Sequence, residues 1–124
     1  MTQAQAGIEG IWLTQEGNSK VEIYEEGDRY YGKIVWMART TDKKGNTLTD
    51  KNNPDKSLRD RPLMGLEMLS NIKYDGNRAN GKIYAPKRGA TLDCELVQQG
   101  DDQLDLLISV KGFTRQQSWT RSQL

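Results

Sequence analysis

The residues best suited to hold a ligand lie together in one short segment, residues 53–61. Arg59 and Arg61 each carry a planar guanidinium that can donate two parallel hydrogen bonds to a carboxylate or a phosphate. Asn53 and Asp55 precede them and could orient either the arginines or a bound molecule. The spacing therefore predicts a small-molecule site. In a second interpretation Arg59 pairs with Asp55 one turn earlier, and the segment is purely structural.

A second set of polar side chains lies on segments rich in β-forming residues. The set comprises Tyr31, Trp36, Glu67 and Tyr84. In a barrel their polar tips could point inward and contact a ligand. Glu67 is the strongest candidate, because it alternates in period two with Leu63 and Leu69; a carboxylate inside a barrel would have a raised pKa and could bind a cation or a hydroxyl. The alternative is that all four pack in the core or on the surface.

Catalytic and metal chemistry have little support in this composition. The chain has no His, which excludes a serine or cysteine nucleophile activated by His. Its single cysteine, Cys94, permits no intrachain disulfide and makes a zinc site unexpected. Cys94 alternates with Leu92 and Leu96, which predicts a buried, inert thiol. We therefore expect no catalytic residue, no metal and no cofactor. An enzyme is the weakest option, since it would need carboxylate, Tyr or Lys chemistry that the sequence does not specify.

Charge and hydropathy exclude two further classes of protein. The chain has 18 basic and 17 acidic residues, a net charge of +1. Proteins that bind nucleic acid through phosphate contacts have a clear basic excess, so no nucleic-acid partner is expected. No apolar run approaches the roughly 20 residues that a membrane-spanning helix needs. A length of 124 residues fits one domain.

The elements that must position these side chains are short strands. Alternating or β-branched runs separated by turn residues recur along the whole chain, as in all-β barrels and sandwiches. The expected strands cover residues 8–13, 20–25, 30–37, 63–73, 80–85, 91–98, 104–110 and 116–121. Short connections favour sequential pairing, and eight strands can close without exposed edges. The pattern predicts an all-β fold, an eight-stranded antiparallel up-and-down β-barrel.

One connection, residues 39–61, is much longer than the others and has only two large apolar residues, Leu48 and Leu58. Its sequence Asn52-Asn53-Pro54-Asp55 is typical of turns, and residues 57–60 could form one helical turn. Irregular connections of this length are often lids or binding loops. The site is therefore expected at the barrel mouth beneath this loop.

The first and last strands carry features that could close the barrel. Gly10 and Trp12 lie on the first strand, and Trp119 and Arg121 lie on the last. These strands must be neighbours in a closed meander, and a guanidinium over an indole ring gains about 0.5–2 kcal/mol. We expect an architectural seam there, not the site. The alternative is two unrelated core tryptophans.

Seven runs of residues resemble a bacterial domain-of-unknown-function family grouped with the calycins. The runs are Gly10-Ile11-Trp12, Val21-Glu22-Ile23-Tyr24, Tyr31-Gly32-Lys33-Ile34-Val35-Trp36, Asp50-Lys51-Asn52-Asn53-Pro54-Asp55, Leu58-Arg59-Asp60-Arg61-Pro62-Leu63-Met64-Gly65-Leu66, Gly81-Lys82-Ile83-Tyr84-Ala85-Pro86 and Trp119-Thr120-Arg121. The resemblance covers nearly the whole chain and implies a lipocalin-like barrel. The chain departs from the family pattern at Ala85 and at Gly89-Ala90-Thr91-Leu92. The family has no established activity to carry over.

The resemblance also implies export through a signal peptide. It favours Ala4-Gln5-Ala6 as a trace of a signal-peptidase site over a simple polar tail. Residues 1–7 are thus expected to be a tail or signal-peptide remnant, residues 8–122 the barrel domain, and the protein periplasmic or secreted.

Two functions follow from the predicted fold. The first is the binding of a small ligand at the barrel mouth, by Asn53, Asp55, Arg59, Arg61 and the lumenal candidates. The second is a structural or protein-interaction domain whose barrel is filled by side chains and whose basic loop faces a partner. The sequence predicts neither the ligand nor the oligomeric state.

Overall fold

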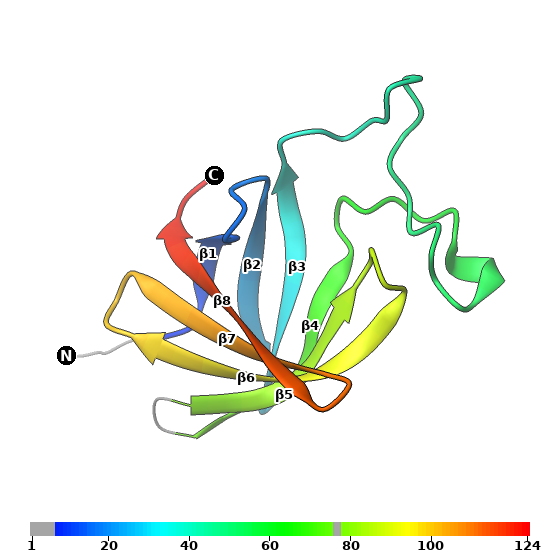
Figure 1. Cartoon of the computed structure of the whole chain (residues 1–124). Coiled ribbons are helices and arrows are strands. Elements are labelled where there is room, and N and C mark those ends of the chain that lie inside the picture. Colours follow the sequence, from blue (N-terminus) through cyan, green and yellow to red (C-terminus); the bar gives the residue numbers. More distant parts are fainter. Residues whose placement is uncertain (1–6, 76–77) are drawn as a thin grey trace.

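A computed structural model describes residues 7–75 and 78–124. Eight strands and one turn of 3₁₀-helix follow one another along the chain (Figure 1). They are β1 (Gly10–Leu13), β2 (Ser19–Glu26), β3 (Arg29–Met37), η1 (Lys56–Leu58), β4 (Glu67–Asp75), β5 (Arg78–Ala85), β6 (Ala90–Gln99), β7 (Gln103–Val110) and β8 (Phe113–Ser122). Ala4-Gln5-Ala6 and all but the last residue of the expected tail lie outside the described residues.

The strands form a closed barrel in the order β1-β2-β3-β4-β5-β6-β7-β8, each antiparallel to the next. β1 also pairs with β8, which closes the sheet into a barrel. The predicted eight-stranded up-and-down barrel is confirmed. The predicted starts of two strands were wrong: β4 begins at Glu67, four residues late, and β8 begins at Phe113, three residues early.

The two ends of this barrel differ. Residues 14–18, 38–66, 86–89 and 111–112 join strands at one end, which we call the open end (Figure 1). Residues 27–28 and 100–102 join strands at the other, the closed end. Residues 38–66 extend well beyond the strands, and η1 lies far from the barrel wall (Figure 1).

Side chains fill the closed end. The interior rows follow the period of two that the sequence predicted: Leu104, Leu106, Ile108 and Val110 of β7 are all buried. Trp12 and Trp119 are fully buried in the same core cluster and are the largest of its fully buried side chains. The largest side chains of the core therefore lie at one end of the lumen only.

The seam between β1 and β8 is built around Arg121. Trp12 and Arg121 are direct partners in the ladder, and the Arg121 guanidinium carbon lies 4.2 Å from the centroid of the Trp12 ring. The same guanidinium donates hydrogen bonds to the carbonyl oxygens of Gly7 (2.6 Å), Glu9 (2.5 Å) and Asp101 (2.8 Å). The predicted stacking of Arg121 on Trp12 is thus present in the structure.

Gly10 is required at this seam for two reasons. Its φ is +123°, a conformation that side chains with a Cβ rarely adopt. A Cβ there would also lie 2.8 Å from Arg121 Nη1. The spacing of Gly10 and Trp12 therefore leaves room for the arginine and provides the ring beneath it.

Cys94 faces the interior, as its alternation with Leu92 and Leu96 predicted, and is 5% exposed. Burial raises the pKa of its thiol to about 12. The thiolate is the reactive species, so very little of it exists at pH 8. We expect no reaction with a chromogenic disulfide reagent at pH 8 in native buffer, and one equivalent reacting in denaturant. Rapid stoichiometric reaction of the native protein would contradict this.

Candidate functional site

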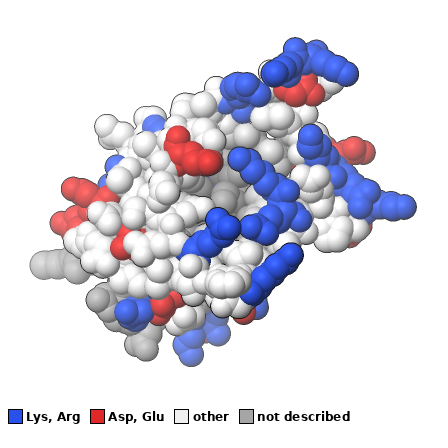
Figure 2. Space-filling view, viewed as in Figure 1, with Lys and Arg blue, Asp and Glu red and all other residues white. Residues whose placement is uncertain are grey.

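A cavity of about 780 Å³ occupies the lumen at the open end. Its walls are mainly apolar and come from inward positions on β3, β4, β5, β6 and β7. They include Ile34, Met68, Ile83, Leu92, Ile108 and Val110. These aliphatic side chains are smaller than the two tryptophans at the closed end, so the barrel is packed at one end and hollow at the other. The hollow is visible from outside in the space-filling view (Figure 2).

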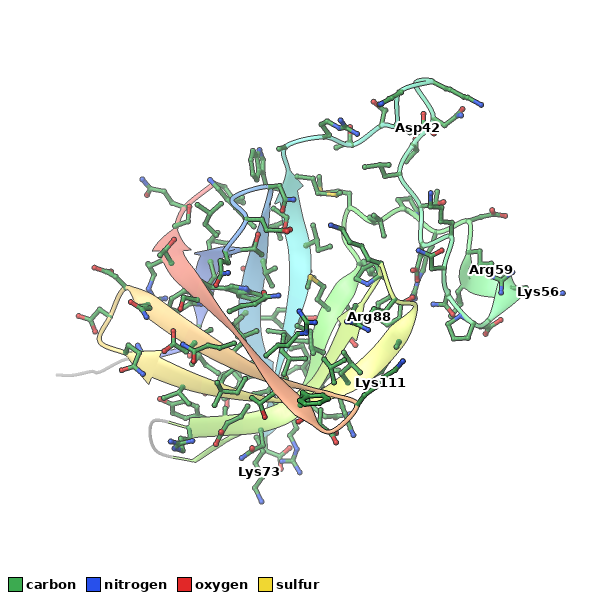
Figure 3. The ribbon with its side chains drawn as sticks, viewed as in Figure 1. Asp42, Lys56, Arg59, Lys73, Arg88 and Lys111 are labelled. Atoms are coloured by element: carbon green, nitrogen blue, oxygen red, sulfur yellow. The ribbon has the colours of Figure 1, made fainter. Side chains whose placement is uncertain are left out.

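Basic residues surround the mouth of this cavity. Those that border it are Arg39, Lys87, Arg88 and Arg115, against a single acidic residue, Glu16. We call these four cations the basic rim. Figure 2 shows blue side chains gathered beside the hollow, and Figure 3 labels Arg88 on the β5–β6 turn at this end. Their charge is concentrated where this cavity meets solvent.

A buried aspartate holds the long connection against the barrel. Asp50 is 1% exposed. Its Oδ2 accepts hydrogen bonds from Asn53 Nδ2 (2.8 Å) and from Arg61 Nε (3.2 Å) and Nη2 (3.0 Å). Its Oδ1 accepts one from the Tyr84 hydroxyl at 2.7 Å. We call these four residues the Asp50 cluster; it ties residues 38–66 to β5.

The cluster fixes the protonation of its members. Burial acts to raise the pKa of Asp50, but the hydrogen bonds from Asn53, Tyr84 and Arg61 outweigh it and lower the pKa of Asp50 below its ordinary 3.8. The pKa of Tyr84 is raised, by burial and by its hydrogen bond to Asp50. Asp50 is therefore ionised and Tyr84 neutral at pH 7, and each polar atom of the carboxylate already has a partner.

The other residues of the predicted loop site also satisfy one another. Asp55 caps η1, accepting hydrogen bonds from the backbone and hydroxyl of Ser57. Arg59 Nε donates to the carbonyl oxygen of Asn53 at 2.6 Å. The expected helical turn is present, one residue earlier than predicted. This geometry favours the structural interpretation of residues 53–61, although Arg59 contacts a carbonyl where a pairing with Asp55 was expected.

The structure separates the predicted site residues into two groups. Tyr84 borders the cavity, whereas Asn53, Asp55, Arg59, Arg61 and Glu67 do not. The site was expected beneath the 53–61 segment, but that segment lies beside the mouth on the outer side of the barrel (Figure 3). A direct role of these side chains in ligand contact stays a prediction.

Of the four side chains that could point into the barrel, Glu67, Tyr31 and Trp36 do not, and the alternative of surface packing describes these three. Glu67 is exposed, because the β3–β4 register shifts between the pairs Gly32↔Leu69 and Lys33↔Glu67. The shift inserts Met68 as an extra residue and reverses the alternation that Leu69 sets. Tyr31 and Trp36 lie on the outer face of β3: Tyr31 stacks on Tyr24, and Trp36 is 37% exposed beneath the Lys20 ammonium.

Sequence reasoning missed Asp50 and the basic rim. Asp50 belonged to a noted turn sequence, but nothing local distinguishes it from the other acidic residues of the loop. Arg115 had a signal that could have been used. It stands in period two with Gln117 and the buried Trp119, which places it on an inward row.

Within the described part of the chain, no three His, Cys, Asp or Glu side chains are grouped so that they could hold a metal ion. No helix among the described residues is long and apolar enough to cross a membrane.

A closed eight-stranded meander with one packed end and one hollow, apolar end defines a lipocalin-like protein. The chain belongs to the family DUF2147, described as an uncharacterized protein conserved in bacteria, whose model matches residues 10–121. The match therefore begins at Gly10 and ends at Arg121, the two sides of the seam.

A solved structure supports the same class. The chain is similar to protein HP1028 from Helicobacter pylori, described as belonging to the lipocalin family, with a TM-score of 0.79 and 25% sequence identity. The similarity covers 95% of this chain and 84% of that one. No curated protein has a sequence that matches this chain.

Proposed function

We propose that the protein binds a small, predominantly apolar molecule in the cavity at the open end. The observation that carries the proposal is the cavity itself: about 780 Å³, with apolar walls and a floor of packed side chains. Ligand sites of drug-sized molecules are clefts of roughly 300–1,000 Å³ with mostly apolar linings. The lipocalin classification of the similar H. pylori protein supports the proposal. Export of the protein, expected from the family resemblance, stays a prediction.

The alternative of a barrel filled by side chains requires a lumen without free volume. The described residues leave the open end hollow, so this alternative has less support than ligand binding. The exposed loop, with Lys56 and Arg59 at its tip, is still available to a protein partner (Figure 3).

The test is to fill the cavity without altering the outer surface. Ile108 lies on the cavity wall, and Ser109, its neighbour on β7, is exposed. We expect wild-type protein to bind N-phenyl-1-naphthylamine, a neutral apolar dye, at one saturable site. Ile108→Trp should weaken binding at least about tenfold, because the indole occupies the ligand volume; a tenfold loss corresponds to about 1.4 kcal/mol. Ser109→Trp adds the same group outside and should bind like wild type.

Circular dichroism melts of both variants are the control that each barrel is folded. Leu92→Trp, on the neighbouring strand β6, serves as a second cavity variant should Ile108→Trp prove unstable. No binding of the dye by wild-type protein, or equal binding by the Ile108 and Ser109 variants, would overturn the proposal.

A further inference from the structure

Resting on the proposed function, we propose that the ligand is an anionic amphiphile, with its apolar chain in the lumen and its carboxylate or phosphate group at the basic rim. The rim contributes four positive charges, and the mouth carries one carboxylate, that of Glu16. Such a ligand matches both halves of the site at once.

Arg115 is the residue that most directly indicates an anionic group. It pairs with Ile108 across the β7–β8 ladder, and the pairs that follow on the same row are Gln117 with Leu106 and Trp119 with Leu104. On this row Leu104, Leu106, Ile108 and Trp119 are buried, and Gln117 is half-buried. A guanidinium at an inward position of an apolar lumen has no role in packing the core, and it lies where the head of a bound chain would emerge.

The rim cations come from separate parts of the chain. Arg39 follows β3, Lys87 and Arg88 form the β5–β6 turn, and Arg115 lies on β8. Among the described residues, 7–75 and 78–124, the four side chains donate no hydrogen bond and form no ion pair. By contrast, Arg61 and Arg78, also on the surface, both have carboxylate partners. Convergence of unpaired cations on one opening favours a mobile anion as their partner.

Gln117 adds a neutral donor below the rim. Its side-chain oxygen accepts a hydrogen bond from Trp119 Nε1 at 3.1 Å, so the amide nitrogen is oriented away from that contact. Gln117 also borders the cavity. The cavity lining thus passes from aliphatic walls to an amide and then to guanidinium groups at the mouth. Polarity rises along this path as it does along an amphiphile.

The experiment compares four probes with the same ten-carbon chain by calorimetry or by displacement of N-phenyl-1-naphthylamine. The probes are decanoate, decanol and decyltrimethylammonium, with decyl phosphate added to distinguish the two anionic groups. We expect the wild-type protein to bind decanoate about tenfold more tightly than decanol, as charge-assisted hydrogen bonds allow. Decyltrimethylammonium should bind most weakly. The preference for the anion should decrease as salt is raised.

The variant Arg88→Gln/Arg115→Gln should lose the preference for decanoate while keeping the affinity for decanol. Lys73→Gln is the matched control: Lys73 is exposed on β4, away from the cavity, and the same chemical change there should leave the preference intact (Figure 3). Because both rim arginines are exposed, their replacement should not unfold the protein.

The outcomes separate this inference from the proposed function. Equal binding of decanoate and decanol by wild-type protein, or an unchanged preference in the double variant, overturns the inference and leaves ligand binding standing. Tighter binding of the cationic probe also overturns it. Failure of all the probes and of the dye overturns both proposals.

Discussion

Replacement of Arg121 by Ala is expected to lower the free energy of unfolding by about 3 kcal/mol and the melting temperature by roughly 10 °C. The side chain makes three hydrogen bonds to the carbonyl oxygens of Gly7, Glu9 and Asp101 and stacks on Trp12. Hydrogen bonds from a charged donor contribute about 1.5–3 kcal/mol each when shielded, and a cation–π contact about 0.5–2 kcal/mol. Partial exposure of Arg121 reduces the sum.

Two further variants decide whether the stability depends on the planar guanidinium of Arg121 or only on its positive charge. Arg121→Lys keeps the charge but loses the planar donors, so it should recover less than half of the lost stability. Thr120→Ala changes the exposed neighbour on β8 and should melt within about 2 °C of wild type. Equal melting temperatures for the Ala, Lys and wild-type proteins would show that the seam adds nothing to stability.

The seam and the strands could be predicted because their signals are local or come from the chain ends. Period-two alternation placed β2, β3, β6 and β7 within a few residues of their observed bounds. Closure followed from the number of strands and from the aromatic and basic residues at both ends. The prediction for Glu67 failed where a register shift between β3 and β4 reverses the alternation, and an inserted residue such as Met68 has no sequence signal of its own.

The site was less predictable, because its contacts join residues far apart in sequence. Asp50 and Tyr84 are 34 residues apart, and only the folded path of residues 38–66 brings them together. Without that path, the arginines of the loop looked like ligand-binding groups. In the structure Arg61 holds Asp50 instead, while less conspicuous cations, Arg88 and Arg115, border the cavity.

Asp50→Asn is expected to lower the free energy of unfolding by about 2–3 kcal/mol at pH 7, a fall in melting temperature of roughly 8–12 °C. The change is nearly isosteric, so no cavity forms. Its new amide nitrogen must replace an oxygen that accepts a hydrogen bond, either from Arg61 and Asn53, which can only donate there, or from the Tyr84 hydroxyl, which would have to rotate and accept. The buried charge that pairs with Arg61 is also lost. Because the Arg61 side chain is 40% exposed, water replaces part of this lost interaction. Asp60→Asn, an exposed change in the same loop, should melt like wild type.

The pH dependence of this difference identifies the ionised carboxylate as its cause. The pKa of Asp50 is lowered in the folded protein, so its contribution is fully present above the unfolded value of 3.8 and is lost as the pH falls through the folded value. The stability gap between wild type and Asp50→Asn should stay constant between pH 7 and about pH 5 and close below about pH 4. Denaturant titrations across this range measure the gap. A gap that is unchanged at pH 3, or absent at pH 7, would mean that the charge of Asp50 does not anchor the loop, and the open end would then depend on other contacts, such as those of Asn52 with Pro86 and Lys87.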